Sequence, residues 1–408
     1  MAVIGAGPAG LAAAISAKEN GGKNIIIFDR NNWLGGILPQ CIHDGFGVEE
    51  TGSSMTGPEY ADDYIKKVEK LNIELIKETM VLSFNKNLEI TYANKEGIHK
   101  IKAKSIVLAM GCREKTRWNI MIPGDRPSGI YTAGATQAFI NLYNIMPGKK
   151  VVILGSGDVG LIMARRLKFE GAEILGVIEI LPYASGLPRN VVQCLDDYNI
   201  PLYLNHTITN IEGRNRLEKV IVSKIDKNSL PIPGTDKTLF CDTLLLSLGL
   251  IPENELSIEA GIVIDSITKG PVVNQFFETN LSGVYACGNC LQVYDTVDLL
   301  SLDAKIAGRH AAGDIDKKES VEKKINIVAG DGIKYVIPQT INEAGDVFFT
   351  MRVEKPGKPT KLRICTNKNE IFNKKLHWIN PANMIRLKVK ISDEVIKSSN
   401  ELEVKLDN

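Results

Sequence analysis

A cysteine and a histidine lie close together in the segment LPQCIHDGFG, residues 38–47, shortly after a Gly-Gly pair. A thiol can act as a nucleophile or a redox group, and an imidazole can donate or accept a proton near neutral pH. Cys41 is therefore a candidate for half of a redox dithiol, for a lone catalytic thiol, or for a packed side chain. His43 is a candidate acid–base group or a structural histidine.

A glycine motif at the start of the chain indicates a nucleotide site. Gly5, Gly7 and Gly10 form G-x-G-x-x-G between an apolar strand, residues 2–4, and an alanine-rich segment, residues 11–17. The first glycine allows a tight turn, the second lets a pyrophosphate approach the backbone, and the third lets a helix pack closely on the strand. The N-terminus of that helix would donate N–H groups to the phosphates.

The same pattern occurs a second time. Another G-x-G-x-x-G, residues 155–160, again follows an apolar strand. In each unit a further strand leads to an acid, Asp29 in the first and Glu179 in the second, at the same distance from the first glycine. A carboxylate at that point can accept hydrogen bonds from a ribose hydroxyl. Two units that agree in this way predict two dinucleotide sites.

The second acid favours one nicotinamide cofactor. A carboxylate at the end of this strand repels a 2′-phosphate and suits the free 2′-hydroxyl of NAD. The residues that follow Glu179 are Ile-Leu-Pro-Tyr-Ala, and they contain no arginine that could bind a phosphate. We therefore expect NAD(H) rather than NADP(H).

The bulk composition is that of an ordinary globular protein, and it limits the kinds of binding partner that we expect. The 408 residues are enough for two or three domains, and the formal net charge of +1 does not indicate a nucleic-acid partner. No apolar run approaches the ~20 residues of a membrane span, and the first residues do not have the pattern of a signal peptide. Seven scattered cysteines argue against a secreted disulfide framework, so we expect a cytoplasmic protein.

These motifs resemble those of the pyridine nucleotide–disulfide oxidoreductases, and the sequence is most similar to their compact thioredoxin-reductase-like branch. Residues 105–111 (SIVLAMG) and 243–249 (TLLLSLG) resemble the segments that lead out of the FAD and NAD domains of that family. Residues 283–289 (GVYACGN) resemble the motif in which the chain returns to the flavin, and the helix expected from Asp303 to Ala312 resembles the one that points at the isoalloxazine ring.

This resemblance covers about residues 1–316 and implies FAD at the first site and NAD(H) at the second. One position departs from the family, which usually has an aspartate where this chain has Asn289. An amide can still hydrogen-bond a ribityl or phosphate oxygen, but it carries no charge. The cofactor-binding residues predicted for the two sites are Gly5, Gly7, Pro8, Ala9, Gly10, Asp29, Arg30, Gly36, Gln40, Met80, Val81, Ala109, Gly111, Gly155, Gly157, Asp158, Val159, Glu179, Gly249, Gly288, Asn289 and Ala304.

The redox dithiols of the family are missing from their usual places. Residues 37–47 contain only Cys41, and the cysteines between residues 160 and 249 are Cys194 and Cys241, which are far apart. One C-x-x-C remains, Cys287 with Cys290, and it is either a redox pair or two small packed residues. The sequence has no second C-x-x-C or histidine pair that would predict a zinc site. The candidate catalytic residues are Cys41 and His43, and we expect direct hydride transfer between nicotinamide and flavin.

The predicted fold class is α/β, with two Rossmann-like dinucleotide-binding domains and a small C-terminal antiparallel β domain. The FAD domain is discontinuous, residues 1–116 and 252–316, and the NAD(H) domain, residues 117–251, is inserted in it. Residues 317–408 begin with a charged linker. They continue as short stretches in which apolar and polar residues alternate, separated by residues typical of turns, and this pattern favours β strands. Because minimal two-dinucleotide reductases end near residue 316, this last domain is an addition and a candidate for partner docking.

The whole layout resembles two groups of flavoproteins. One is encoded beside a glycerol-3-phosphate dehydrogenase-like flavoprotein and a small cysteine-rich protein; the other comprises FAD subunits of amine- and opine-oxidising complexes. The resemblance implies an electron-transfer subunit that exchanges electrons with a second redox subunit, in a hetero-complex or a homo-oligomer. Two alternatives remain open: a stand-alone NADH oxidase or peroxidase in which Cys41 cycles through sulfenic acid, and a non-catalytic FAD-binding redox sensor.

Overall fold

The computed structural model describes residues 1–313, 324–366 and 369–407. The chain forms two compact units. One unit joins Met1–Cys112 to Pro252–Asn408, and the other is Arg113–Ile251. The predicted domain boundaries remain predictions, and the boundary at residues 316 and 317 lies outside the described residues. The predicted fold class is confirmed: two parallel Rossmann-like sheets are accompanied by additional, mainly antiparallel sheets.

The first unit is built on a five-stranded parallel sheet in the order β20-β9-β1-β2-β5. Its strands are β1 (Ala2–Ile4), β2 (Ile26–Phe28), β5 (Glu74–Ile76), β9 (Ile106–Leu108) and β20 (Val284–Ala286). Each of these strands is short and almost wholly apolar, as expected where helices cover a parallel sheet. The sheet therefore places the ends of β1, β9 and β20 side by side, directly before the segments that carry the predicted cofactor residues.

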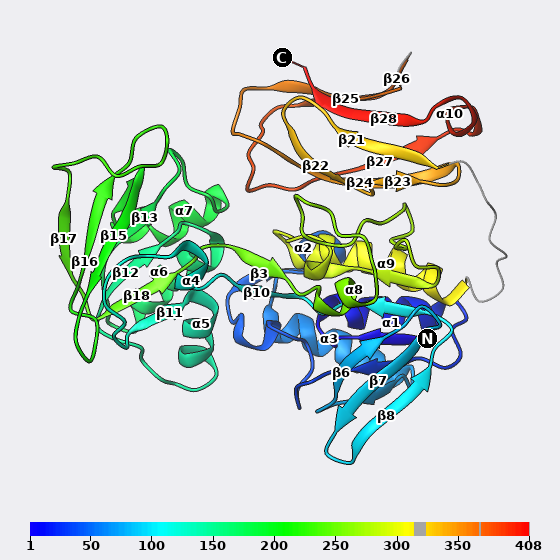
Figure 1. Ribbon diagram of the computed structural model, residues 1–408, viewed down its shortest axis with the longest axis horizontal. Coiled ribbons are helices and arrows are strands. Elements are labelled where there is room, and N and C mark those ends of the chain that lie inside the picture. The colour runs from blue at the N-terminus through cyan, green and yellow to red at the C-terminus, as the bar shows by residue number, and fades with distance from the viewer. Residues whose placement is uncertain (314–323, 367–368, 408) are drawn as a thin grey trace. The chain divides into compact units, whose positions relative to one another are not determined.

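Two helices pack closely beside this sheet, α1 (Pro8–Glu19) and α9 (Val297–Gly313), as Figure 1 shows in blue and yellow. Gly308 permits the contact, since a Cβ atom there would lie 2.0 Å from the Ala13 carbonyl oxygen. The helix expected from Asp303 to Ala312 starts earlier, at Val297, because Leu299 and Leu300 are buried and continue its apolar face. The third helix, α3 (Gly57–Lys70), is amphipathic and buries Tyr60, Tyr64 and Val68 on one face.

Smaller elements accompany the parallel sheet and its helices in this unit. One antiparallel sheet contains β6 (Met80–Phe84), β7 (Glu89–Asn94) and β8 (Gly97–Lys102). A short hairpin, β3 (Asp44–Phe46) and β4 (Met55–Thr56), flanks the four-residue helix α2 (Val48–Thr51). The segment with Cys41 and His43 leads directly into this hairpin.

The C-terminal part of the same unit consists of two β-sheets, drawn in yellow to red in Figure 1. Side chains from both sheets form one apolar core of their own. The alternating stretches of the sequence become strands, and one pair of them, β21 with β28, is parallel rather than antiparallel. The elements are β21 (Ile325–Ala329), β22 (Ile333–Ile337), β23 (Thr340–Ile341), β24 (Gly345–Val353), β25 (Thr360–Cys365), β26 (Glu370–Leu376), β27 (Ile385–Ile391), α10 (Asp393–Ser398) and β28 (Glu401–Leu406).

The second unit repeats the Rossmann plan with a parallel sheet in the order β11-β18-β12-β13-β14. A three-stranded antiparallel sheet, β15-β16-β17, accompanies it. The main elements are β11 (Ile130–Thr132), α5 (Ala133–Asn141), β12 (Lys150–Leu154), α6 (Asp158–Phe169), β13 (Glu173–Glu179), α7 (Pro188–Cys194), β14 (Leu202–Leu204), β15 (His206–Glu212), β16 (Lys219–Lys224), β17 (Lys237–Phe240) and β18 (Thr243–Leu246).

Candidate dinucleotide-binding sites

The first glycine loop has the geometry that a phosphate cradle requires. Gly5 has φ +106°, and a Cβ atom there would lie 2.4 Å from the Ala109 carbonyl oxygen. A Cβ atom at Gly10 would lie 1.8 Å from the carbonyl oxygen of Gly5. Gly7 is the N-cap of α1, and no described side chain caps that end of the helix or adds an acid to its first turn. The backbone N–H groups there suit a phosphate, which fits the pyrophosphate of FAD.

Three distant segments meet at this end of α1. Gly36, with φ +60°, lies against the glycine loop, since a Cβ atom there would be 3.0 Å from the Gly7 Cα atom. Gly288, with φ +75°, faces Ala9, because its Cβ atom would lie 2.6 Å from the Ala9 Cβ atom. The predicted residues of the three motifs are therefore neighbours in space.

Asp29 holds the glycine loop in place. Its Oδ2 atom accepts a hydrogen bond of 2.7 Å from the Ala6 N–H group, and its Oδ1 atom accepts one of 2.8 Å from the Asn31 N–H group. The side chain is buried, but a carboxylate has about four acceptor positions, so further acceptor capacity remains for a ribose hydroxyl. The Thr79 N–H group bonds the Asp29 carbonyl, which brings the start of β6 to the same place.

The other residues predicted around this site differ in exposure. Val81 and Gln40 are buried, and Ala304 is fully buried within α9, whereas Arg30 and Met80 are exposed. Asn289 accepts a hydrogen bond of 3.1 Å from the Tyr294 N–H group and donates one of 3.5 Å to the Cys112 sulfur. Its amide therefore fixes the local loop, and its role toward a cofactor stays a prediction.

The second glycine loop repeats the cradle in the other unit. Gly155 has φ +94°, and its Cβ atom would lie 2.1 Å from the Ser247 carbonyl oxygen. Gly157 is the N-cap of α6, and the Gly160 N–H group donates to the Ser247 hydroxyl at 3.2 Å. Asp158, in the first turn, accepts hydrogen bonds from Leu187 and Asn190, so its carboxylate is turned toward the following loop.

Glu179 is held more firmly than its counterpart Asp29. Its Oε2 atom accepts from the Ser156 N–H group at 3.0 Å, from the Ser156 hydroxyl at 2.5 Å and from the Ser185 hydroxyl at 3.0 Å. Its Oε1 atom accepts from the Leu181 N–H group at 3.0 Å, and the residue is 3% exposed. The acid is thus positioned beside the glycine loop, and its Oε1 atom has more remaining acceptor capacity than its Oε2 atom.

The segment with Cys41 and His43 is closely packed. The Cys41 thiol donates to the Ile37 carbonyl at 3.4 Å, and a Cβ atom at Gly57 would lie 2.8 Å from the Cys41 Cβ atom. Burial raises the pKa of the Cys41 thiol to about 12, so the nucleophilic thiolate is scarce at neutral pH. The His43 Nδ1 atom lies 3.1 Å from the Asp44 carbonyl oxygen, and its ring centre is 5.0 Å from that of Phe46.

The hairpin that follows is anchored by residues that the sequence motifs do not indicate. Asp298, on the first turn of α9, accepts hydrogen bonds from the N–H groups of Gly47, Glu49 and Glu50. Glu50 accepts from the hydroxyls of Tyr60 and Tyr64 and forms an ion pair with Lys305. Burial alone would raise the Glu50 pKa, but these hydrogen bonds outweigh it and the pKa is lowered. No sequence signal connects these residues, because they lie on separate elements.

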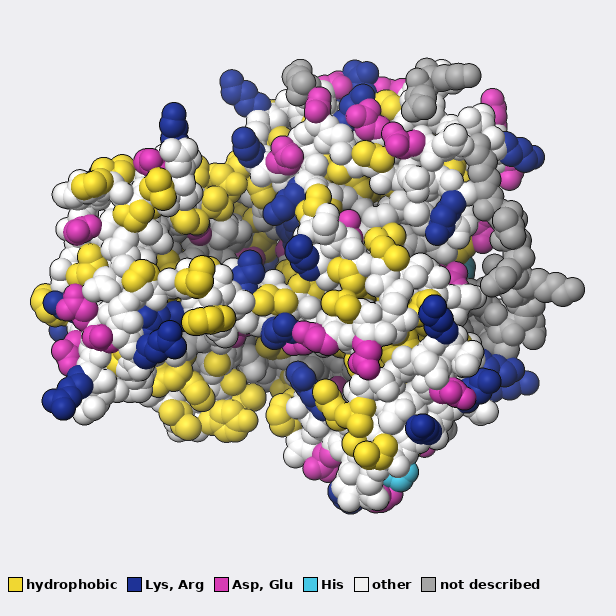
Figure 2. All heavy atoms as spheres, in the orientation of Figure 1, with side chains coloured by type: hydrophobic (Ala, Val, Ile, Leu, Met, Phe, Trp, Pro, Cys, Tyr) yellow, Lys and Arg dark blue, Asp and Glu magenta, His cyan; other side chains and the backbone are white. Residues whose placement is uncertain are grey.

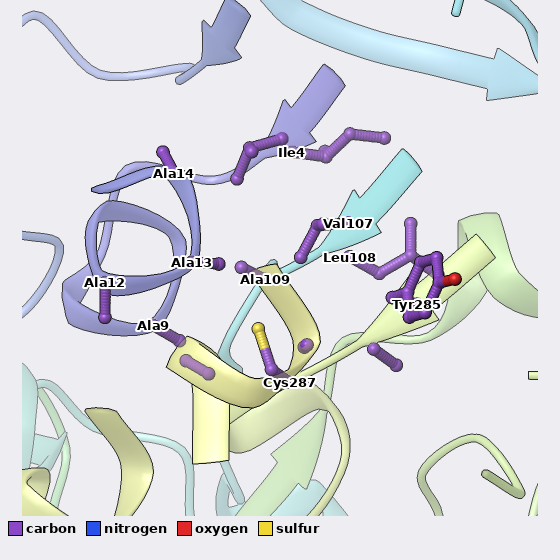
Figure 3. Close-up of a cluster of buried hydrophobic side chains, with 14 of the residues drawn as sticks. Ile4, Ala9, Ala12, Ala13, Ala14, Val107, Leu108, Ala109, Tyr285 and Cys287 are labelled. Atoms are coloured by element: carbon purple, nitrogen blue, oxygen red, sulfur yellow. The ribbon is translucent and has the colours of Figure 1, made fainter. Parts of the chain in front are cut away.

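Cys287 and Cys290 are both fully buried, and Figure 3 shows Cys287 among apolar side chains of α1, β9 and β20. The Cys290 thiol donates to the carbonyls of Leu108 and Cys287, at 3.3 and 3.2 Å. Burial raises the pKa of Cys287 and raises that of Cys290 to about 11. Both environments favour the neutral thiol, and none of the seven cysteines, all of which lie in the described residues, forms a disulfide.

A protein-family model, described as pyridine nucleotide-disulphide oxidoreductase, matches residues 1–312. The chain belongs to this family. Members of this family are oxidoreductases that use FAD and a pyridine nucleotide. Among solved structures it is similar to a thioredoxin reductase from T. acidophilum, with a TM-score of 0.63 and 22% identity over 77% of this chain and 97% of that one. A NAD-dependent persulfide reductase from A. fulgidus gives a TM-score of 0.58 and 18% identity over 96% and 71%.

Three curated relatives are similar to this chain at 23–26% identity. The HcnB protein of Pseudomonas protegens, a hydrogen cyanide synthase subunit, is 23% identical over 64% of this chain and 58% of its own length. An opine oxidase subunit from Agrobacterium tumefaciens is 23% identical over 70% and 60%, and an NADH oxidase of Methanocaldococcus jannaschii is 26% identical over 86% and 77%. The chain thus spans about three fifths of the length of the first two relatives.

No helix of the described residues is both long and apolar enough to cross a membrane. Basic and acidic side chains are interspersed on the face shown in Figure 2, in keeping with the net charge of +1.

Proposed function

We propose that this chain is the NADH-linked flavin subunit of a dehydrogenase complex. Hydride exchange with a nicotinamide is the chemistry that a bound flavin supplies. The observation that carries the proposal is the pair of complete glycine cradles, each with its buried acid, in a chain whose candidate thiols have raised pKa values. Cofactor-to-cofactor transfer needs no thiolate, whereas a thiol-based reductase does.

The chain's own residues would bind and orient the cofactors. The loop from Gly5 to Gly10 and the N-terminus of α1 would hold the FAD pyrophosphate, and Asp29 would accept from a ribose hydroxyl. In the second unit, the loop from Gly155 to Gly160 would hold the NADH pyrophosphate. Glu179 supports NADH over NADPH, because a buried carboxylate repels a 2′-phosphate.

The proposal of a partner is supported by the relatives. The HcnB protein and the Agrobacterium tumefaciens opine oxidase protein are both named as subunits of larger enzymes. A second redox subunit would take electrons from the flavin or return them to it, in a cytoplasmic hetero-complex. A homo-oligomer of this chain is compatible with the same role.

A stand-alone NADH oxidase is the second candidate, favoured by the extent of the match to the Methanocaldococcus jannaschii NADH oxidase. If Cys41 cycled through sulfenic acid, its thiolate would have to form, and a pKa of about 12 opposes that step.

Rapid mixing with NADH in the absence of oxygen tests the main proposal. The flavin absorbance near 450 nm should bleach fully in the parent and in Cys41→Ser, and air should restore the colour slowly without a partner. A flavin that NADH does not bleach would favour the redox-sensor alternative. Fast turnover with oxygen that is lost in Cys41→Ser would favour the oxidase.

A further inference from the structure

The C-terminal sheets hold the segment that follows the late flavin motif, residues 291–296. Three groups of this segment form hydrogen bonds with the C-terminal part of the chain: a side-chain amide, a backbone carbonyl and a side-chain carboxylate. The hydrogen bonds are Gln292 Nε2 to Thr350 Oγ1 at 2.8 Å, Arg352 Nη2 to the Val293 carbonyl at 3.0 Å, and the Met384 N–H group to Asp295 Oδ2 at 2.8 Å. Thr350 and Arg352 lie on β24, so one strand makes two of the contacts.

A buried ion pair adds a second attachment, to α9. Asp303 is fully buried, and its Oδ1 atom accepts a hydrogen bond of 3.0 Å from Arg386 Nε on β27. The Nη2 atom of the same guanidinium forms an ion pair with Oδ1 at 3.0 Å. The Tyr294 hydroxyl donates to Oδ2 of the same carboxylate at 2.9 Å. The Arg386 guanidinium also lies over the Phe348 ring, 4.2 Å from its centre. Removing one partner of such a pair leaves a charge buried without compensation, which is strongly unfavourable.

A third attachment lies before the flavin motif. Val273 and Gln339 exchange two hydrogen bonds, Val273 N–H to Gln339 Oε1 at 3.0 Å and Gln339 N–H to the Val273 carbonyl at 3.1 Å. The Asn342 N–H group also donates to Gln275 Oε1 at 3.0 Å. The C-terminal sheets therefore contact the chain on both sides of β20, the strand that leads into the flavin motif.

The path from these attachments to the first cradle is short. Tyr294, which bonds Asp303 through its hydroxyl, also donates its N–H group to Asn289, and Gly288 packs on Ala9 beside the glycine loop. We propose that the C-terminal domain positions the flavin motif through Arg386, Arg352 and Thr350, so that FAD binding and docking of this domain stabilise each other. This inference rests on the proposed FAD site and adds a function to a domain that the sequence suggests only for partner docking.

Two arginines of the C-terminal domain provide a matched comparison. Arg386→Met removes the cation from the buried Asp303, whereas Arg363→Met removes a half-exposed arginine that pairs with Asp407 inside the same domain. FAD would be removed from each protein, and its dissociation constant measured by titration with flavin fluorescence. We expect Arg386→Met to weaken FAD binding by at least tenfold and Arg363→Met to change it by less than twofold. Thr350→Val, which keeps the side-chain volume, should weaken it by about threefold.

Coupling is reciprocal, so FAD must also stabilise the docked domain. Amide hydrogen exchange in β27 should slow when FAD is added to the parent and should respond much less in Arg386→Met. Equal FAD affinity in parent and folded Arg386→Met would overturn the inference. If Arg386→Met does not fold, Thr350→Val decides in the same way, and parental affinity there would overturn it. A parent that never binds FAD would overturn the proposed function itself, which separates the two failures.

Discussion

Neutralising Glu179 should reduce the proposed preference of this chain for NADH over NADPH. The change to test is Glu179→Gln, which keeps the size of the side chain and removes its charge. Because Glu179 is 3% exposed, salt screens it only weakly. Two unit charges 4 Å apart interact by about 4 kcal/mol at an effective dielectric constant of about 20. If half of that repulsion acts on the 2′-phosphate of bound NADPH, Glu179→Gln removes about 2 kcal/mol of unfavourable energy. This corresponds to a roughly thirtyfold change in the ratio of the affinities for NADH and NADPH.

The same substitution has a structural cost that the structure identifies. Glu179 accepts from Ser156 and Ser185 at one oxygen and from Leu181 at the other. A glutamine has one oxygen, so its NH₂ group must face one of these donors, and an unsatisfied buried donor costs about 1–3 kcal/mol. We therefore expect a lower melting temperature together with the changed preference.

Anaerobic rapid mixing gives the assay, as the ratio of flavin reduction efficiency with NADH to that with NADPH. Glu173→Gln is the control, because Glu173 is an exposed acid at the other end of the same strand. The ratio should fall about thirtyfold in Glu179→Gln and remain within twofold in Glu173→Gln. An unchanged ratio in a folded Glu179→Gln protein would refute the reasoning, because the acid would then not sense the 2′-position.

The first cradle and the thiols lead to three further predictions. Purified protein should be yellow with roughly one FAD per chain. The Gly10→Ala variant should lose the flavin, because the new Cβ atom would lie 1.8 Å from the Gly5 carbonyl oxygen. A stable, yellow Gly10→Ala protein would contradict this prediction. Reductive titration should consume two electrons per chain in the parent and in Cys287→Ser with Cys290→Ser, and four electrons in the parent would indicate a redox dithiol. Because the Cys41 pKa is raised to about 12, its alkylation by iodoacetamide should stay slow at pH 8 and increase steadily toward pH 11; a rate that levels off below pH 9 would contradict the burial argument.

The parts of the fold that the sequence predicts are those fixed by local geometry. Gly5, Gly10 and Gly155 occupy backbone positions where a Cβ atom would collide with a carbonyl oxygen, so the motif implies the loop. Asp29 and Glu179, which have the same spacing from the first glycine, each accept a hydrogen bond from the backbone of their glycine loop. Their role toward a ribose stays a prediction.

The parts that the sequence does not predict depend on contacts between distant residues. Asp298 and Glu50 fix the hairpin through partners from α2, α3 and α9, and Arg386 on β27 forms an ion pair with Asp303 on α9. Charged residues of this kind occur throughout the chain, and nothing in their sequence neighbourhood separates a buried partner from an exposed one. The parallel pairing of β21 with β28 is missed for a similar reason, since alternation predicts strands but not their partners.

The position of Cys41 can be explained by size rather than by thiol chemistry. Gly57 begins α3 against it, and a Cβ atom at Gly57 would lie 2.6 Å from the Cys41 carbonyl oxygen. The Gly57 N–H group donates to that same oxygen at 2.9 Å, so the two backbones are held together. A small, weakly polar side chain fits such a contact, and the thiol finds its acceptor in the Ile37 carbonyl. A residue that is needed only for its size can be replaced by serine or alanine with a modest effect on activity, whereas a catalytic thiol cannot. This difference distinguishes the proposed electron-transfer role from that of a stand-alone NADH oxidase.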